Sequence, residues 1–280
     1  MNIGFHAGRL LARWKRTQWK KRYEKNFPPF PSNAETISKK FVYYTCEEHL
    51  PELILSIQSL IRYVGRPEKI LIIGDGSLSP QTLLRLNQWN PVIQAMNFSQ
   101  FLKPEIPSIL QRHWNRGDLP GKMAIKLSVF MSLPLEGTTV FLDSDIIFYP
   151  GARNHGFFIT ENRSGIFYLR DCGFSGEERM IYNEFEKKNP VNSGFFVLDR
   201  PLDWDRALKR FSELGDTFVW FVDQTSLHLA MHDSHAEELD PQRCVLHLRD
   251  QFQFREDLIP EETVFRHYVT PVRHHLWKRN

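Results

Sequence analysis

Two carboxylates set between two apolar runs constrain this chain more than any other stretch of it. Val140–Leu142 lead into Asp143-Ser144-Asp145, and a second apolar run begins at Ile146. A strand that is apolar on both faces is typical of the centre of a parallel sheet, and its carboxyl end is where open α/β sheets bind ligands. An isolated Asp-x-Asp is also an ordinary solvated turn. Two acids between apolar runs are costly to bury without a partner, however, and a hard divalent cation is the usual one.

The composition predicts a folded α/β protein. The 280 residues are 41% hydrophobic and include 22 Phe and 7 Trp, which is ample material for the core of one large domain or two small ones. A net charge of +3 is too small to imply a nucleic-acid partner, and we expect none. The three cysteines, Cys46, Cys172 and Cys244, are widely spaced, which argues against a disulfide framework and suits a reducing compartment.

Residues 1–25 are strongly basic, with apolar residues at helical spacing. The basic residues are Arg9, Arg13, Lys15, Arg16, Lys20, Lys21, Arg22 and Lys25. They interrupt the apolar residues, so this is no secretory signal, and we expect a cytoplasmic protein. Two interpretations of the helix stay open: a peripheral anchor on the anionic inner face of a membrane, or a terminal helix packed on the domain. A proline-rich linker follows, and we place the domain boundary at residue 38, with 39–280 as the second domain.

The second domain alternates strands and helices. We expect strands over 41–45, 69–73, 91–98 and 139–142, and helices over 50–64, 79–88 and 121–132. This rhythm predicts a parallel sheet with right-handed crossovers. Farther along, we expect strands over 166–169 and 192–198, and helices over 175–188, over 203–214 and from 222. No Gly-x-Gly-x-x-Gly follows the first strand, so a dinucleotide site is not supported.

Three more polar groups stand beside apolar elements. Asn192-Ser193-Gly194 opens a predicted strand, Asp223-Gln224 opens a predicted helix, and His267 precedes Arg273 near the C-terminus. Each group also has a structural interpretation. Asn and Ser are common in turns, Asp at a helix start is commonly an N-cap, and a lone histidine is more often structural than a ligand.

In order and approximate spacing, these groups resemble the nucleotide-sugar glycosyltransferases of the GT-A fold. The likeness is to the retaining family 8 type, which includes bacterial lipopolysaccharide galactosyl- and glucosyltransferases and glycogenin, and it covers about residues 40–278. In that family a Leu-Asp-x-Asp strand end binds manganese, and an Asn-x-Gly strand start and an Asp-Gln helix start frame the sugar. A terminal His-x-x-Gly-Pro-x-Lys motif completes the site. Here His267 and Pro271 match it, Arg273 replaces the lysine, and Thr270 replaces the glycine.

The resemblance implies a role for each of these residues. The ligands of Mn²⁺ (or Mg²⁺) would be Asp143, Asp145 and His267, with His274 as a competing candidate. The donor-binding residues would be Thr45, Lys126, Asp143, Ser144, Ser193, Gly194 and Arg273, and the catalytic group would be Asn192, Asp223 and Gln224. Lys126 stands 17 positions before Asp143, where the family has a basic residue that contacts the donor sugar, although a solvated helix lysine is the plainer interpretation.

We therefore expect an α/β protein of the GT-A fold, with a central, mostly parallel sheet flanked by helices. Its expected activity is metal-dependent transfer of a hexose from a nucleotide-diphosphate sugar, such as a UDP-sugar, to a glycan or lipid-linked acceptor with retention of configuration. The alternatives are an inverting enzyme on the same fold, a sugar nucleotidyltransferase, and a non-catalytic membrane- or polymer-binding protein on this scaffold. The nucleotidyltransferase ranks low because residues 45–49 lack its glycine-rich loop.

Overall fold

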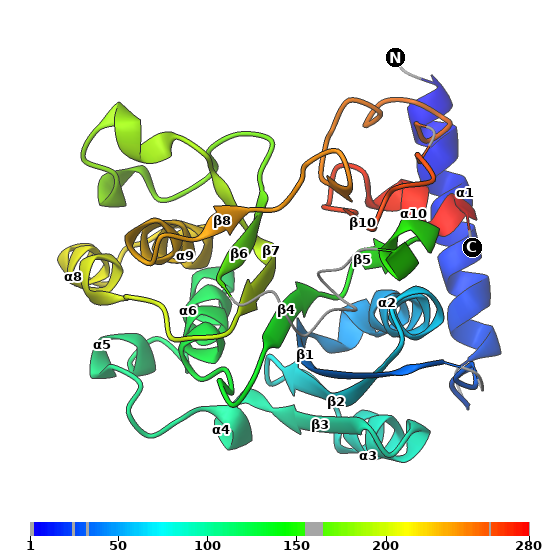
Figure 1. Cartoon of the computed structure of the whole chain (residues 1–280), viewed down its shortest axis with the longest axis horizontal. Coiled ribbons are helices and arrows are strands. Elements are labelled where there is room, and N and C mark those ends of the chain that lie inside the picture. Colours follow the sequence, from blue (N-terminus) through cyan, green and yellow to red (C-terminus); the bar gives the residue numbers. More distant parts are fainter. Residues whose placement is uncertain (1–2, 24–25, 32–33, 155–164, 258, 280) are drawn as a thin grey trace.

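The central sheet is mostly parallel, as the sequence predicts (Figure 1). The computed structural model describes residues 3–23, 26–31, 34–154, 165–257 and 259–279. Within these ranges the strand order is β3-β2-β1-β4-β7-β6-β8. The strands are β1 (Thr36–Thr45), β2 (Arg66–Gly74), β3 (Ile93–Asn97), β4 (Thr139–Asp143), β6 (Phe167–Arg170), β7 (Val191–Leu198) and β8 (Glu237–Glu238). Strands β3, β2, β1 and β4 run parallel, whereas β7 is antiparallel to both β4 and β6.

A second, three-stranded sheet lies beyond the end of β4. It contains β5 (Ile146–Phe148), β9 (Cys244–Val245) and β10 (Phe265–His267). Strand β10 pairs antiparallel with β5 and parallel with β9. Because β5 begins directly after Asp145, this small sheet joins the C-terminal part of the chain to the carboxyl end of β4.

Helices cover both faces of the central sheet (Figure 1). The longer ones are α2 (Leu50–Tyr63), α3 (Pro80–Trp89), α6 (Leu119–Met131), α8 (Asp205–Glu213) and α9 (Val222–Asp233). Two short helices, α4 (Phe98–Phe101) and α5 (Ser108–Gln111), precede α6. Helices α2 and α3 pack on one face, and α6, α8 and α9 pack on the other. The helices predicted over 50–64, 79–88 and 121–132 correspond to α2, α3 and α6.

Strand β1 shows why its sequence is apolar on both faces. Phe41 and Tyr43 pack in the cluster under α2 and α3, whereas Val42 and Tyr44 pack in the cluster under α6. Successive side chains of a strand point to opposite faces, so a strand covered on both sides must be apolar throughout. The alternation therefore places β1, and the neighbouring β4, at the centre of the molecule.

The predicted helix over 175–188 is wrong. The structure has two single turns there, η3 (Glu178–Met180) and η4 (Glu184–Lys187). The side chain of Glu177 accepts from the backbone N–H of Arg179, and the side chain of Asn183 accepts from those of Phe185 and Glu186. Side chains that bond nearby backbone groups compete with a continuous helix, so each turn starts at its own cap and soon ends.

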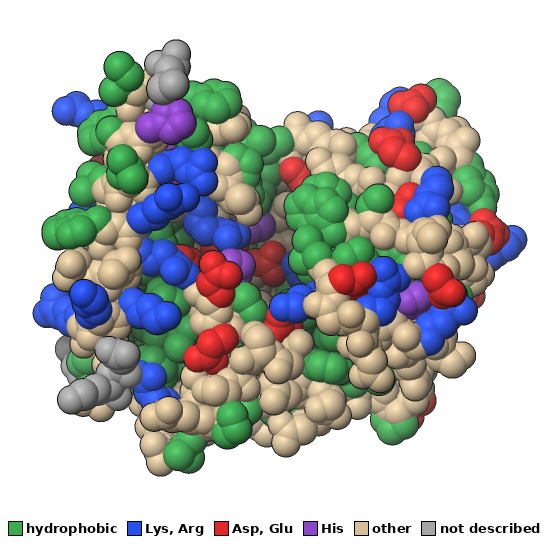
Figure 2. Space-filling view, turned by 180° about the vertical axis from the view of Figure 1, so that it is seen from behind, with side chains coloured by type: hydrophobic (Ala, Val, Ile, Leu, Met, Phe, Trp, Pro, Cys, Tyr) green, Lys and Arg blue, Asp and Glu red, His purple; other side chains and the backbone are tan. Residues whose placement is uncertain are grey.

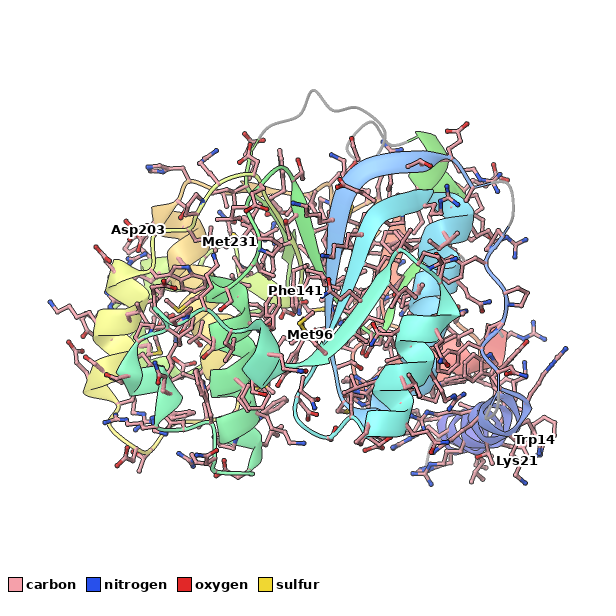
Figure 3. The ribbon with its side chains drawn as sticks, turned by 90° about the horizontal axis from the view of Figure 1, so that it is seen from below. Trp14, Lys21, Met96, Phe141, Asp203 and Met231 are labelled. Atoms are coloured by element: carbon pink, nitrogen blue, oxygen red, sulfur yellow. The ribbon has the colours of Figure 1, made fainter. Side chains whose placement is uncertain are left out.

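The N-terminal helix α1 (Ile3–Arg22) packs on the C-terminal helix α10 (Arg273–Arg279). Its buried residues are Gly8 and Ala12, and Trp19 meets Trp277 edge-on with ring centroids 5.8 Å apart. Figure 3 shows α1 at one edge of the molecule, beside α10. For the described helix Ile3–Arg22, the interpretation as a terminal helix packed on the domain thus agrees with the structure, while the division at residue 38 stays a prediction.

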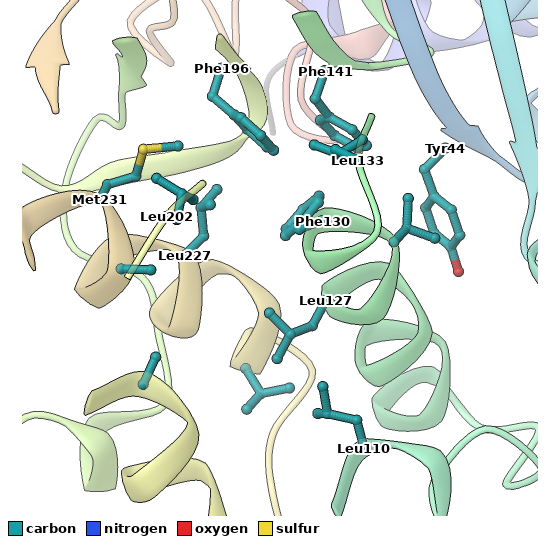
Figure 4. Packing of buried hydrophobic residues seen from close by; sticks show 14 of the residues in the cluster. Tyr44, Leu110, Leu127, Phe130, Leu133, Phe141, Phe196, Leu202, Leu227 and Met231 are labelled. Carbon is teal, nitrogen blue, oxygen red and sulfur yellow. The ribbon is translucent and has the colours of Figure 1, made fainter. Parts of the chain in front are cut away.

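Three phenylalanines form the centre of the core between the sheet and α6 (Figure 4). Phe141 of β4 stacks on Phe196 of β7 with ring centroids 4.9 Å apart and an interplanar angle of 14°. Phe130 of α6 meets both rings edge-on at 4.8 and 5.1 Å. Such aromatic contacts add to the apolar area that the rings remove from water. This cluster holds β4 and β7, the two strands that carry polar groups at their ends, in fixed register.

Replacing Phe196 by alanine should lower the free energy of unfolding by about 3–5 kcal/mol, because it leaves a cavity beside two other rings. The matched control is Phe185→Ala, since the Phe185 side chain is 75% exposed. Its effect should stay within about 0.5 kcal/mol. Urea denaturation followed by circular dichroism measures both, and equal losses would contradict the assigned core.

Candidate active site

Apart from the competing candidate His274, the predicted site residues lie near the carboxyl edge of the parallel strands. Asp143 ends β4, and Thr45 ends β1 beside Gly74 of β2. Strand β7 runs antiparallel to β4, so the start of β7 lies at this edge. Asn192, Ser193 and Gly194 are at that start. Figure 2 shows acidic, basic and histidine side chains gathered in a hollow of the molecular surface. The location is the one at which open α/β sheets bind ligands.

Asp143, Asp145 and His267 form a group that could hold a metal ion. One potential ligand atom from each residue lies within 4.8 Å of the others. His267 comes from the far end of the chain through the small sheet, where it pairs with Ile146 of β5. The backbone N–H of Tyr268 also donates to the carbonyl of Asp145 at 2.9 Å. Two carboxylates and an imidazole suit Mn²⁺, with positions left for phosphate oxygens.

Asn192 fixes the orientation of the His267 ring. The backbone N–H of Gly194 donates to Asn192 Oδ1 at 2.9 Å, and Asn192 Nδ2 donates to Asp171 at 3.0 Å, which together define the amide's orientation. Oδ1 therefore accepts from His267 Nδ1 at 3.0 Å. The other ring nitrogen, Nε2, lies 3.0 Å from Asp145 Oδ1 and so faces the candidate metal ligands. A hydrogen bond on one ring nitrogen prepares the other as a metal ligand.

Gly194 lies directly beneath the His267 ring. A Cβ at this position would come within 2.2 Å of His267 Cε1. The ring is only 3% exposed and is bonded on both nitrogens, so it has little room to move. The resemblance implies that Gly194 binds the donor. In the structure the space that its missing side chain leaves is filled by the histidine.

Arg273, the first residue of α10, lies against Asp145. Its Nη2 and Nε donate to Asp145 Oδ2 at 2.6 and 3.1 Å, and Nη1 lies 3.1 Å from His49 Nε2. Burial opposes ionisation of Asp145, but Arg273 and His267 outweigh it and hold the pKa of this carboxyl well below its usual range. Asp145 is therefore an anion ready for a cation, and Arg273 lies beside it, where phosphate oxygens could approach.

Lys126 links the acidic group to the start of α9. Its Nζ lies 3.0 Å from Asp143 and 3.8 Å from Asp223. Burial disfavours the charged amine, but the two carboxylates outweigh burial and raise the pKa of Lys126. Burial raises the pKa of Asp223, while Lys126 and a 3.1 Å hydrogen bond from Ser193 Oγ act in the opposite direction. The interpretation of Lys126 as a solvated surface lysine is wrong, because its side chain is 8% exposed.

Asp171 is a site residue that sequence reasoning missed. It follows β6, and its Oδ2 accepts from Asn192 Nδ2 and from Gln224 Nε2, each at 3.0 Å. Gln224 Nε2 also donates to the carbonyl of Ser175 at 2.9 Å. One carboxylate thus orients the amides of two predicted catalytic residues. The available signal was its place directly after a strand, the same signal that marked Asp143.

The remaining predicted residues lie at the edges of this group. Thr45 and Ser144 are both buried, and the carbonyl of Thr45 accepts from the backbone N–H of Asp75 at 2.9 Å. The Asp75 carboxylate pairs with Lys122 of α6 at 2.9 Å, a contact that the sequence did not reveal. His274 lies away from the acidic group and meets Phe5 of α1 edge-on with ring centroids 5.5 Å apart. Of the two candidate histidines, His267 therefore has the geometry of a ligand.

A buried ion pair anchors the strand that carries His267. The neighbouring residue in β10 is Arg266, whose guanidinium donates to both oxygens of Asp250 at 2.9 and 2.8 Å and to Glu256 at 2.7 Å. The side chains of Arg266 and Asp250 are fully buried. Burial favours the neutral acid, but Arg266 outweighs it and lowers the pKa of Asp250 to about 2. The pair thus fixes the backbone from which His267 projects.

No model of a known protein family matches the chain, and no curated protein matches it in sequence. Solved structures do match in three dimensions. The galactosyltransferase LgtC, in complex with donor and acceptor sugar analogs, aligns with a TM-score of 0.50 at 11% identity over 83% of this chain and 87% of that chain. Mouse xyloside xylosyltransferase 1 gives 0.50 at 11% identity over 85% and 99%, and the bifunctional glycosyltransferase WbbM gives 0.52 at 11% over 87% and 48%.

These alignments cover most of the chain and decide its architecture. The chain has the GT-A fold. The resemblance predicted from the sequence is therefore confirmed at the level of fold. At 11% identity, the roles of individual residues have to be argued from the geometry of this chain.

Gly194→Ala should weaken Mn²⁺ binding by about 10- to 100-fold, since the new methyl group would displace the His267 ring. Gly173→Ala is the matched control, because a Cβ there meets no atom within 4 Å. Titration calorimetry with MnCl₂ measures both variants. Equal Mn²⁺ affinities in the wild type and Gly194→Ala would rule out His267 as a ligand held in this way.

The Asp250–Arg266 pair should make stability fall at low pH. The pKa of Asp250 is lowered on folding, so its contribution is present above the unfolded value, near 3.9, and is lost as pH falls towards 2. That contribution is roughly 2–3 kcal/mol. Asp250→Asn should flatten the fall in unfolding free energy between about pH 4 and pH 2. Asp257→Asn, the control, alters a pair with Arg249, whose side chain is 70% exposed. This variant should show the same fall in unfolding free energy as the wild type.

Proposed function

We propose that this protein is a metal-dependent glycosyltransferase that moves a hexose from a nucleotide-diphosphate sugar, most simply a UDP-sugar, to a glycan or lipid-linked acceptor. The observation that carries the proposal is the group of Asp143, Asp145 and His267, flanked by Arg273 and Lys126 at the carboxyl edge of a GT-A sheet. A diphosphate leaving group concentrates negative charge. The candidate metal ligands, Arg273 and Lys126 together suit the binding of that charge.

Asp143, Asp145 and His267 would hold Mn²⁺ or Mg²⁺. The bound ion would supply Lewis-acid stabilisation of the departing diphosphate. Arg273 offers a planar guanidinium at the same place, which suits phosphate oxygens. Asp145 and His49 hold the guanidinium in the free protein, and its charge is therefore positioned before a donor binds.

Asp223 and Gln224 would contact the donor sugar. Both are buried at the start of α9, and Lys126 and Ser193 hold Asp223 while Asp171 holds Gln224. A carboxylate and an amide kept in fixed orientations can accept from and donate to sugar hydroxyls. Asn192 shares Asp171 with Gln224 and so belongs to the same support. We propose retention of configuration, and Asp223 is the carboxylate placed to stabilise positive charge at the reacting carbon.

The proposed acceptor is a glycan or a lipid-linked sugar at the cytoplasmic face of a membrane. In the described residues we find no helix with the length and apolar character that a membrane span needs. The basic character of α1 supports this placement, because anionic lipid attracts Lys and Arg.

Asp145→Asn should abolish metal-dependent donor binding, lowering the affinity for a UDP-sugar by at least about 100-fold, since it removes a buried charge that faces both the metal and Arg273. Calorimetry with a panel of UDP-sugars, with Mn²⁺ and with EDTA, gives the measurement. Glu136→Gln is the matched control, because the Glu136 side chain is 94% exposed, and it should bind as the wild type does.

The same experiment separates the alternatives. Binding of no nucleotide sugar by the wild type would contradict the transferase proposal and favour a non-catalytic scaffold. Binding of a nucleoside triphosphate with a sugar phosphate would favour a nucleotidyltransferase. With an acceptor in hand, proton NMR of the first product distinguishes retention from inversion by the anomer that forms.

A further inference from the structure

Three large apolar side chains of α1 form a ridge that faces away from the rest of the molecule. Ile3, Leu10 and Trp14 are 79%, 65% and 59% exposed. Positions seven and four residues apart lie on the same side of an α-helix, so the three side chains line up along it. Trp14 lies on the outer side of α1 in Figure 3, away from the sheet. We call these three residues the outer ridge.

The opposite side of α1 is fixed to the domain, so the ridge cannot turn inward. Gly8 and Ala12 are buried there. Lys15 Nζ donates to the carbonyl of Lys278 at 2.7 Å. Arg16 Nε donates to Glu52 Oε1 at 2.6 Å, and the Glu52 side chain is only 2% exposed. The ridge is therefore a rigid feature of the surface rather than the loose face of a detached helix.

The ridge is flanked by positive charge alone. The sequence from Ile3 to Arg22 contains no Asp or Glu. Five of its basic residues, Arg9, Arg13, Lys20, Lys21 and Arg22, are exposed. Figure 2 shows Lys and Arg side chains along this edge of the molecule, beside apolar ones. The surface thus combines a narrow apolar line with charge of a single sign.

We propose that the outer face of α1 binds the surface of an anionic lipid bilayer. The outer ridge would enter the boundary between headgroups and acyl chains, with Trp14 at the depth where tryptophan is enriched, and the flanking cations would lie among lipid phosphates. A folded protein partner fits less well, because the cores of protein interfaces are depleted in lysine and charge, whereas here cations border a ridge only one side chain wide.

This inference goes beyond the proposed transferase function and does not depend on it. Binding to lipid vesicles needs neither donor nor acceptor, so it succeeds or fails separately from catalysis. If both hold, the bilayer would bring a lipid-linked acceptor to the same surface as the enzyme. The attachment through Lys15 and Arg16 would then set the orientation of the domain on the membrane.

Co-sedimentation of the full chain with phosphatidylglycerol–phosphatidylcholine vesicles tests the proposal. The wild type should bind these vesicles and bind pure phosphatidylcholine far more weakly. Leu10→Ser/Trp14→Ser should lower the partition coefficient by at least about tenfold, since both side chains leave the apolar boundary. Arg9→Gln/Arg13→Gln should lower it on anionic vesicles by about 25-fold, or about fivefold per charge.

The matched control is Phe185→Ser, because Phe185 is a 75% exposed apolar residue of η4, outside α1, and it should bind as the wild type does. Circular dichroism and thermal unfolding check that each variant stays folded. The proposal is overturned if the wild type does not bind anionic vesicles, if neutral vesicles bind it equally, or if the Leu10/Trp14 variant binds like the wild type.

Discussion

The antiparallel pairing of β10 with β5 is the interaction on which the site depends. It brings His267 to Asp145 across 122 positions of sequence, and the amide of Tyr268 bonds the carbonyl of Asp145 itself. Because β5 follows β4 after a single turn, the two aspartates lie directly beside the strand that pairs with β10, which carries His267. Arg266 and Asp250 hold β10 from its other side. The geometry of the candidate metal site is thus assembled mainly by strand pairing.

Much of this was predictable, because burial leaves a clear mark on sequence. The runs over 41–45, 69–73 and 139–142 are apolar on both faces, since helices cover both sides of β1, β2 and β4. Asp143 and Asp145 stood out because carboxylates are unusual next to such runs. The order of the polar groups then led to His267, whose Nε2 lies 3.0 Å from Asp145 Oδ1 in the structure.

Other features of the site and fold could not be predicted from the sequence, because they depend on contacts that only the folded chain makes. Asp171 looks like any acid after a strand until Asn192 and Gln224 are seen to share its carboxylate. Gly194 looks like a flexible residue until the His267 ring is found against it. The region 175–188 has a helix-like composition, but Glu177 and Asn183 bond the backbone locally and divide it into turns. In each case tertiary context or a side-chain cap decides what local pattern leaves open.

The buried pair of Arg16 and Glu52 has a consequence for how this protein can be shortened. Glu52 accepts from Arg16 of α1 and from the indole of Trp277 in α10, and Arg273 begins that same helix. A chain beginning after Arg22 would leave the Glu52 carboxylate without its cation and uncover one side of α10. The N-terminal helix therefore supports the helix that begins with Arg273, the arginine proposed to bind the diphosphate. Trimming it as a dispensable tail would disturb the proposed active site.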